Sequence, residues 1–256
     1  MIELNRIYNE DCLDGMKRIP DGSVDCIICD LPYGTTKNKF DKIIPIEKIW
    51  EQYKRVIKHN GAIILFAQIP FMIELAHSNL DMLKYEWVWE KAMPTGFLNC
   101  NFAPLKCHEN ILVFSKSSAC YVNDKSRAMI YNPLFRNGKP YKCRQGNAGN
   151  GNYDSKNMID CTTINDGTRY YPRDVIRFGR DKEKLHPTQK PVALIEYLIK
   201  TYSNEGETVL DNCMGSGTTA IACINTNRNF IGFELNKEFY DISLKRIEEH
   251  EHRKER

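Results

Sequence analysis

The order of apolar and polar residues along the chain predicts a regular alternation of strands and helices. Short apolar runs, which are typical of buried strands, occupy positions 6–8, 24–29, 62–67, 85–89, 110–114, 208–210 and 230–233. Apolar residues spaced three and four apart, which are typical of amphipathic helices, occupy positions 13–19, 45–58, 70–80, 192–202, 218–226 and 237 onward. Seven strands that alternate with helices predict a doubly wound α/β domain with a mostly parallel sheet.

The stretch from Ser117 to Gly179 interrupts this alternation. Turn signals such as Asn137-Gly138 and Asp166-Gly167 recur in it, and six tyrosines are spread among its basic residues. So long an irregular segment is usually either functional or disordered, and this one is rich in aromatic residues for a disordered linker. We therefore expect an insert at 117–182 within a domain formed by residues 1–116 and 183–256.

The insert is basic, whereas the rest of the chain is slightly acidic. Residues 117–180 hold eleven Lys/Arg, five Asp and no Glu, a net charge of 11 − 5 = +6; the whole chain carries +3, so the remainder carries 3 − 6 = −3. A basic surface with interspersed aromatic residues favours contact with a phosphate backbone, although a solvated loop rich in lysine carries the same charge. The candidate contact residues are Arg136, Lys139, Lys142 and Arg144.

Length and composition favour a single globular enzyme domain. The 256 residues can bury one substantial core. No basic stretch followed by an apolar segment begins the chain, and no apolar span approaches about 20 residues, so we expect neither secretion nor membrane insertion. Ten cysteines in such a chain predict reduced thiols and a cytoplasmic location. Cys26 and Cys29 lie three apart in a predicted strand and face opposite sides, and the other cysteines follow no zinc spacing, so we expect no metal site.

Two of the predicted strands end in an acidic residue and a tight turn. Strand 24–29 is followed by Asp30-Leu31-Pro32-Tyr33, and strand 208–210 by Asp211-Asn212-Cys213-Met214-Gly215-Ser216-Gly217-Thr218-Thr219. The carboxyl ends of parallel strands meet at one edge of the sheet, where ligands of such folds bind. We expect the two turns to form one site.

With these motifs in this order, the chain resembles the β-class amino DNA methyltransferases, which methylate N6 of adenine or N4 of cytosine in restriction–modification systems and phages. Residues 30–33 are similar to the family's DPPY motif, 211–219 to its DPFxGSGTT motif, and His186-Pro187-Thr188-Gln189-Lys190-Pro191 to its HPTQKP segment. The resemblance implies a Rossmann-like methyltransferase fold with a seven-stranded sheet, in which 117–182 is the target-recognition insert. It also implies S-adenosylmethionine as cofactor and double-stranded DNA as substrate.

The same resemblance implies the catalytic residues Asp30, Leu31, Pro32 and Tyr33. Asp30 would accept a hydrogen bond from the amino group of a flipped base, and a main-chain carbonyl at Leu31 or Pro32 would accept a second one. Tyr33 would stack on the base. Leu31 replaces the first proline of the family motif, which leaves the direction of that carbonyl open.

Cofactor-binding residues follow from the resemblance in the same way. Asp211 would meet the methionyl ammonium, Glu234 the ribose hydroxyls, and Gly215 and Gly217 would let the backbone approach. The full set is Asp11, Cys12, Asp30, Thr188, Gln189, Lys190, Asp211, Asn212, Cys213, Gly215, Gly217, Thr218 and Glu234, with Asp11 and Cys12 beside the adenine and 188–190 near the methionyl carboxylate. Asn212-Cys213 replace the family's Pro-Phe. For His108-Glu109, which precede strand 110–114, we expect a structural role.

Several other functions compete with this interpretation. An NAD-dependent oxidoreductase would also have a Gly-x-Gly turn followed by an acid such as Glu234, but the third glycine of that fingerprint is missing. A methyltransferase that acts on RNA or protein, where a related NPPY turn occurs, fits the motifs less well. The same is true of a non-catalytic DNA-binding regulator. Asp30 favours adenine, because SPPY is typical of cytosine N4 enzymes. The recognition sequence, a cognate restriction endonuclease and a homodimer are left open.

Overall fold

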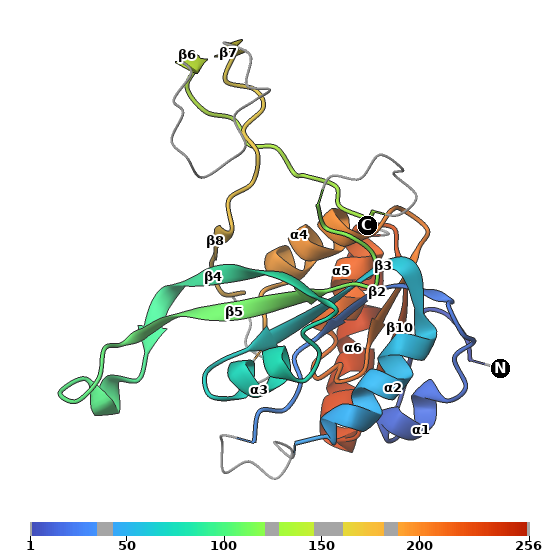
Figure 1. Cartoon of the computed structure of the whole chain (residues 1–256). Coiled ribbons are helices and arrows are strands. Elements are labelled where there is room, and N and C mark those ends of the chain that lie inside the picture. The colour runs from blue at the N-terminus through green and yellow to red at the C-terminus, as the bar shows by residue number, and fades with distance from the viewer. Residues whose placement is uncertain (1, 35–42, 121–127, 146–160, 182–188, 255–256) are drawn as a thin grey trace. The chain divides into compact units, whose positions relative to one another are not determined.

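The computed structural model describes residues 2–34, 43–120, 128–145, 161–181 and 189–254 (Figure 1). The chain forms two compact units. One consists of Met1–Asn132 and Asp174–Arg256, and the other of Pro133–Arg173.

The larger unit is built on one sheet, which has eight strands among the described residues. They are β1 (Arg6–Tyr8), β2 (Val24–Cys29), β3 (Ile57–Ala67), β4 (Leu83–Thr95), β5 (Lys106–Phe114), β8 (Val175–Phe178), β9 (Thr208–Asp211) and β10 (Asn229–Phe233). Their order is β1-β10-β9-β2-β3-β5-β4-β8. Only β5 runs antiparallel to its neighbours β3 and β4 among these strands, which confirms the mostly parallel sheet.

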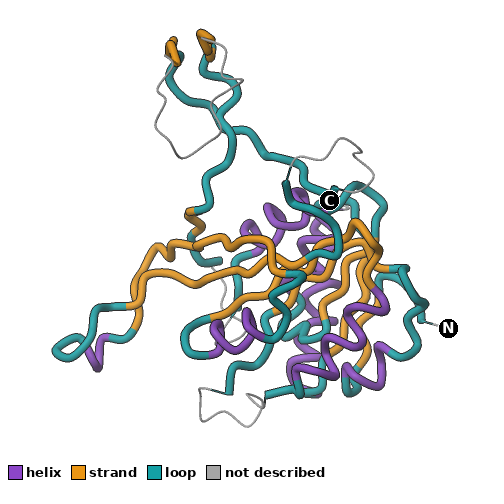
Figure 2. The backbone as a smooth tube through the Cα atoms, viewed as in Figure 1, coloured by secondary structure: helices purple, strands orange, loops and turns teal. Residues whose placement is uncertain are grey.

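Helices cover both faces of this sheet (Figure 2). They are α1 (Cys12–Met16), α2 (Ile46–Val56), α3 (Phe71–His77), α4 (Val192–Tyr202), α5 (Thr218–Asn225) and α6 (Lys237–Lys254), with a short 3-10 turn, η1 (Phe97–Asn99). Residues of β2 alternate between the two layers: Cys26 and Ile28 pack with α4 and α5, and Ile27 and Cys29 with α1, α2 and α3. Burial on both faces explains why β2 is apolar throughout, and it confirms that Cys26 and Cys29 face opposite sides.

Among the described residues, the sheet has one strand more than the seven that the sequence predicts, and the additional strand is β8. β8 pairs with β4 at the sheet edge, with Val88 opposite Val175. Along β8 only Ile176 is buried, while Val175 and Arg177 are exposed. An edge strand of four residues with one core side chain carries too little periodicity to be recognised.

A second difference concerns the start of β3. The expected helix to residue 58 ends at Val56, and the strand expected from 62 already begins at Ile57. Asn60-Gly61 lies inside the strand, where a Cβ on Gly61 would stand 2.6 Å from the Asp25 carbonyl oxygen. Glycine therefore serves a close approach of two backbones here rather than a helix end.

The smaller unit is shorter than the expected insert of 117–182. Residues on either side of it bond to the larger unit, since the Ile130 amide donates to Asn60 O at 3.0 Å and the Val88 amide to Asp174 O at 2.8 Å. Within it, β6 (Tyr141–Gln145) pairs antiparallel with β7 (Cys161–Asn165), although no strand was expected there. Tyr141 and Ile164, large apolar residues of this ribbon, are exposed, and apolar side chains that face solvent produce no alternating pattern in the sequence.

In the described part of the chain, no helix is long and apolar enough to cross a membrane.

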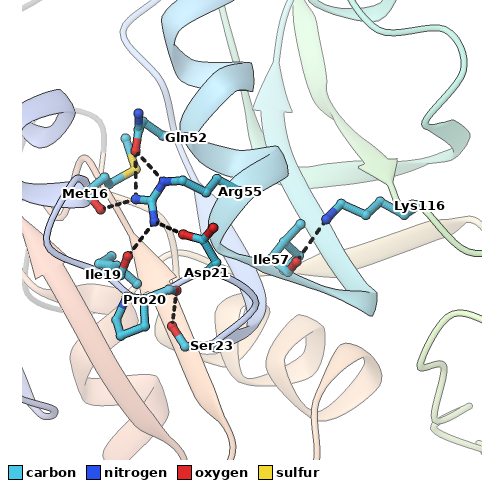
Figure 3. Close-up of polar contacts among 9 residues, drawn as sticks. All are labelled: Met16, Ile19, Pro20, Asp21, Ser23, Gln52, Arg55, Ile57 and Lys116. Atoms are coloured by element: carbon cyan, nitrogen blue, oxygen red, sulfur yellow. Dashed lines mark hydrogen bonds and ion pairs between the residues drawn. The ribbon is translucent and has the colours of Figure 1, made fainter.

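Arg55 of α2 ties the end of α1 to the rest of the α1/α2 layer (Figure 3). Its Nη2 donates to Met16 O at 2.6 Å, and its Nη1 donates to Ile19 O and to Asp21 Oδ1, both at 2.6 Å. Gln52 Oε1 accepts from Nη2 at 2.9 Å and so orients the guanidinium. The last carbonyls of a short helix need such partners, because no further turn supplies amides.

Replacing Arg55 with Met should lower the free energy of unfolding by about 1–3 kcal/mol, because the carbonyls of Met16 and Ile19 lose charged donors while the aliphatic stem is kept. Urea unfolding followed by circular dichroism measures this. Lys54→Met, at an exposed position of the same helix, is the matched control and should unfold like the wild type. Equal midpoints for both variants would show that this network does not stabilise the fold.

Candidate functional site

The two acidic turns leave the sheet side by side. β2 and β9 pair in parallel, with Cys26 opposite Val209 and Ile27 opposite Leu210. Asp211 is the last residue of β9, and Asp30 directly follows β2. The strand order also reverses between these two strands, because β2 is followed outward by β3 and β9 by β10. Such a reversal is the usual ligand-binding position of a doubly wound sheet.

The turn after β2 is anchored in the core and presents one carboxylate. Leu31 is only 5% exposed and packs in the core between the sheet and α1–α3. The Tyr33 hydroxyl donates to Asp30 Oδ1 at 2.7 Å, and its ring stacks on Phe71 of α3 with the centroids 5.1 Å apart. Burial and the charge of Asp30 raise the pKa of Tyr33 well above its usual value, so the phenol stays a neutral donor. Pro32 is half-buried.

A lysine from another element holds the second oxygen of this carboxylate. Lys190, two residues before α4, forms an ion pair with Asp30 Oδ2, and its Nζ lies 3.3 Å from Glu109 Oε2. Burial by itself would lower the pKa of Lys190, but the two carboxylates outweigh it and raise this pKa. The ammonium expected near a methionyl carboxylate is therefore engaged by Asp30 and Glu109.

The turn after β9 depends on two glycines in the left-handed region. Gly215 has φ +55° and Gly217 has φ +81°. A Cβ on Gly217 would stand 3.0 Å from Ser243 Cβ of α6, so a side chain there is both strained and crowded. A Cβ on Gly215 would meet nothing within 4 Å among the described residues, which leaves open space beside that backbone.

Asp211 is a buried acid with neutral partners. It is 5% exposed; its Oδ2 accepts from the Thr219 hydroxyl at 2.5 Å and its Oδ1 from the Cys213 amide at 3.0 Å. Burial raises the pKa of Asp211 to about 6, although these hydrogen bonds oppose the shift and the charge of Asp30 adds to it. A cationic ligand group beside this carboxylate would stabilise its ionised form.

Glu234, directly after β10, reaches across to the glycine turn. Its Oε2 accepts from the Gly215 amide at 2.8 Å, and its Oε1 from the Asn236 amide at 2.7 Å. Burial raises the pKa of Glu234. The carboxylate therefore lies beside the backbone that is open for a ligand.

The residues expected beside an adenine ring, Asp11 and Cys12, lie at the start of α1, which follows β1. Asp11 caps α1, with Oδ1 accepting from the Leu13 amide at 2.8 Å. Cys12 is buried, and its sulfur accepts from Asn212 Nδ2 at 3.5 Å. The Tyr53 hydroxyl donates to Asn212 Oδ1 at 2.5 Å, so Asn212 links α2 to this loop.

The remaining predicted residues fall into three groups. Thr188 lies outside the described residues, as do His186 and Pro187. Gln189 Nε2 donates to Asp181 Oδ2 at 2.9 Å, and Thr218 begins α5 with its hydroxyl accepting from Arg246 Nη1 at 2.9 Å. Arg136, Lys139 and Lys142 are exposed in the smaller unit, and Arg144 lies in β6. Their role in DNA binding stays a prediction.

These residues fit a cofactor that carries both an amino acid and a ribose. A buried carboxylate at Asp211 suits an ammonium, and Glu234 offers carboxylate oxygens beside an open stretch of glycine backbone. Four strand ends, those of β1, β2, β9 and β10, contribute to the site. Sequence reasoning missed Tyr53, Phe71 and Lys91, because their partners are far away along the chain and no motif marks them.

Comparison with known proteins agrees with this geometry. The family described as "DNA methylase" (N6_N4_Mtase) matches residues 24–245. The type II methyltransferase M.BglII of Bacillus subtilis is 31% identical over 262 residues, covering 94% of this chain and 68% of that protein. The DNA adenine methyltransferase YhdJ of Escherichia coli is 28% identical over 270 residues, covering 96% and 83%. The crystal structure of the M1.HpyAVI–SAM complex superimposes with a TM-score of 0.60 at 25% identity, covering 94% of this chain and 98% of that one.

The raised pKa of Asp211 predicts how stability depends on pH. The folded state binds this proton more tightly than the unfolded state, whose ordinary value is 3.8. The stabilisation that this proton gives to the folded state is therefore fully present below about pH 4, and it is lost as pH rises through about 6. Asp211→Asn should remove this loss, worth roughly 2–3 kcal/mol, and become more stable relative to wild type between pH 4 and 7.

Urea unfolding at several pH values measures the difference. Asp81→Asn, at an exposed position, should track the wild type throughout. If the difference between Asp211→Asn and wild type does not change with pH, Asp211 titrates as an ordinary exposed acid.

Proposed function

The chain belongs to the N6/N4 DNA methylase family, and from this membership we propose that it transfers a methyl group from S-adenosylmethionine to the exocyclic N6 of adenine in duplex DNA. One observation carries the proposal: Asp30, with its Pro32-Tyr33 turn, leaves the sheet beside the Gly215/Gly217 turn at the point where the strand order reverses. Acceptor and donor of a methyl group would meet at that edge.

Binding and orientation are the work of the chain's own residues. S-adenosylmethionine, when bound, supplies a methyl group that its sulfonium makes electrophilic. Asp211 would hold the methionyl ammonium, Glu234 the ribose hydroxyls, and Cys12 with Asn212 would border the adenine. The open backbone at Gly215 supports this assignment, because a side chain there would fill the space beside the turn.

On the other side of the site, Asp30 would accept a hydrogen bond from the amino group of the target base. This keeps the nitrogen lone pair out of the ring system and directed at the methyl group. A base inside a duplex cannot reach such a buried edge, so the target must be flipped out of the stack. Tyr33, already stacked on Phe71, would provide the aromatic surface that receives it.

Adenine is the preferred base for two reasons. Asp rather than Ser stands first in the motif at residues 30–33. One relative that covers 96% of this chain is named as an adenine methyltransferase. N4-methylation of cytosine is the second candidate, since the family includes both reactions. A cognate restriction endonuclease and a homodimer stay open, as the sequence left them.

We propose further that the smaller unit reads the DNA. Lys142 of the β6–β7 ribbon is exposed, and so is Lys139, which lies just before the ribbon. Arg169 stacks on the Phe135 ring, 4.4 Å from its centroid, so aromatic and basic groups are interleaved. A two-stranded ribbon of this kind has the width to enter a major groove.

Asp30→Ala should lower single-turnover methylation by about 100-fold or more, because the amino nitrogen loses its acceptor in the transition state. S-adenosylmethionine affinity, measured by calorimetry, should persist. Tyr33→Phe keeps the ring and should remain active, whereas Tyr33→Ala should be severely impaired. Mass spectrometry of digested nucleosides should identify N6-methyladenine; N4-methylcytosine would overturn the base assignment, and full activity of Asp30→Ala would overturn the mechanism.

Neutralising Arg136, Lys139, Lys142 and Arg144 together to Gln should weaken DNA binding and reduce its salt dependence. Each phosphate that the variant no longer neutralises lowers the slope of log K against log salt by about 0.9. Fluorescence anisotropy at several salt concentrations measures the slope, and calorimetry should show unchanged cofactor affinity. Replacing Lys17, Lys48, Lys54 and Lys84 of the larger unit is the matched control. An unaltered slope would make the basic insert a solvated surface only.

A further inference from the structure

The Asp30 carboxylate is one end of a buried row of alternating charges that spans three separate parts of the larger unit. From this row we propose that Lys190 and Glu109 are positioning residues for methyl transfer: Lys190 fixes Asp30 through Oδ2, Glu109 fixes Lys190, and Oδ1 is the acceptor for the target amino group. The inference rests on the role proposed above for Asp30.

The contacts of this row are continuous. Lys190 Nζ pairs with Asp30 Oδ2 and lies 3.3 Å from Glu109 Oε2. Lys91 Nζ, from β4, lies 2.5 Å from Glu109 Oε1. The side chains of Lys190, Glu109 and Lys91 are 10%, 9% and 10% exposed. All three side chains are thus largely removed from water, which is rare for charged groups unless they are paired with one another.

The positive and negative charges of the row balance, so each charged group depends on its neighbours in the row. Two carboxylates and two ammonium groups alternate, so removing one member leaves a buried charge without its partner. Burial would raise the pKa of Glu109, but Lys190 and Lys91 together hold this pKa below its usual value. Among the described residues, Glu109 Oε2 has no aligned hydrogen-bond donor and relies on the charge of Lys190. Glu109 is therefore placed to hold Lys190, and Lys190 to hold Asp30.

The two oxygens of Asp30 are not equivalent as acceptors. Oδ2 is engaged by an ammonium, whereas Oδ1 accepts only the neutral Tyr33 hydroxyl at 2.7 Å among the described residues. A base amino group is also a neutral donor. If it replaces the Tyr33 hydroxyl on Oδ1, the number of hydrogen bonds to this oxygen stays the same. Displacing Lys190 would instead break a buried ion pair. Oδ1 is thus the oxygen that the target takes, and Tyr33 occupies it until then.

This assignment separates Lys190 from cofactor binding. Its ammonium is shared between two carboxylates and lies over the Phe66 ring, 5.0 Å from the centroid. Removing it should therefore affect the chemical step and leave cofactor affinity intact. A lysine that held the methionyl carboxylate would show the opposite behaviour.

The test uses the full chain with Lys190→Met, Glu109→Gln and the double variant. Calorimetry gives S-adenosylmethionine affinity. Single-turnover rates are measured with enzyme in excess over unmethylated genomic DNA and saturating tritiated cofactor. Lys58→Met is the matched control, because Lys58 pairs with the buried Asp25 at the opposite end of β2, 2.5 Å away. It should lose stability but keep the wild-type rate.

We expect Lys190→Met to slow methylation about 100-fold and Glu109→Gln about 10-fold, both with cofactor affinity within about threefold of wild type. The double variant should be no slower than Lys190→Met, because Glu109 acts only through Lys190. Lys190→Arg, which keeps the charge, should recover part of the rate.

Three results would overturn the inference: an unchanged rate in Lys190→Met, a weakened cofactor affinity whose effect disappears at saturation, or losses that multiply in the double variant. If Lys190→Met cannot be purified in a folded state, the nearly isosteric Glu109→Gln provides the test. An unchanged methylation rate in Glu109→Gln would also contradict the inference. Asp30→Ala measured in parallel separates the two proposals. Its full activity would remove the proposed mechanism, whereas a slow Asp30→Ala beside a fast Lys190→Met would remove only this inference.

Discussion

The parallel pairing of β2 with β9 is the constraint on which the site depends. These strands are separated by about 180 residues of sequence, yet they lie side by side with Ile27 opposite Leu210. Both are buried on both faces by helices, so their register is fixed by packing as well as by hydrogen bonds. Their ends therefore form a rigid edge, from which Asp30 and Asp211 can be presented with little freedom. Precise placement of this kind supplies much of the rate in a transfer between two bound groups.

The two acids at this edge have different interaction partners. Asp30 has an ammonium partner in Lys190, whereas Asp211 has hydrogen bonds from a hydroxyl and an amide. Burial consequently raises the pKa of Asp211 to about 6. A positively charged ligand would offset that cost of burial, whereas Asp30 Oδ2 already has Lys190 as its cationic partner and Oδ1 accepts from a neutral donor. One carboxylate is thus suited to a cationic cofactor and the other to a base.

The proposed roles of recognition and chemistry fall on separate units of the chain. The larger unit contains the sheet, the two turns and the buried row of charges. The unit at Pro133–Arg173 contains the β6–β7 ribbon, in which Tyr141 and Ile164 are exposed. Outside the ribbon, Arg136 and Tyr170 of this unit are joined by two backbone hydrogen bonds at 3.1 and 3.0 Å. Such a unit can change its surface residues without disturbing the core, which suits a segment that determines which DNA sequence is read.

By itself, the sequence determined the doubly wound fold and the positions of the two acidic turns. Buried strands such as 24–29 must be apolar on both faces, and tight turns at their ends need residues such as Pro32 and Gly217, so both features are visible locally. The edge strand β8 and the β6–β7 ribbon were decided by the tertiary structure. In β8 only Ile176 is buried, and Tyr141 and Ile164 of the ribbon are exposed, so the sequence shows no period at either place. The same holds for the engagement of Lys190 by Glu109, which are 81 positions apart, and for the link between Tyr53 and Asn212. Contacts of this kind leave no local pattern, since only the folded sheet brings the partners within reach and removes the water that would otherwise separate their charges.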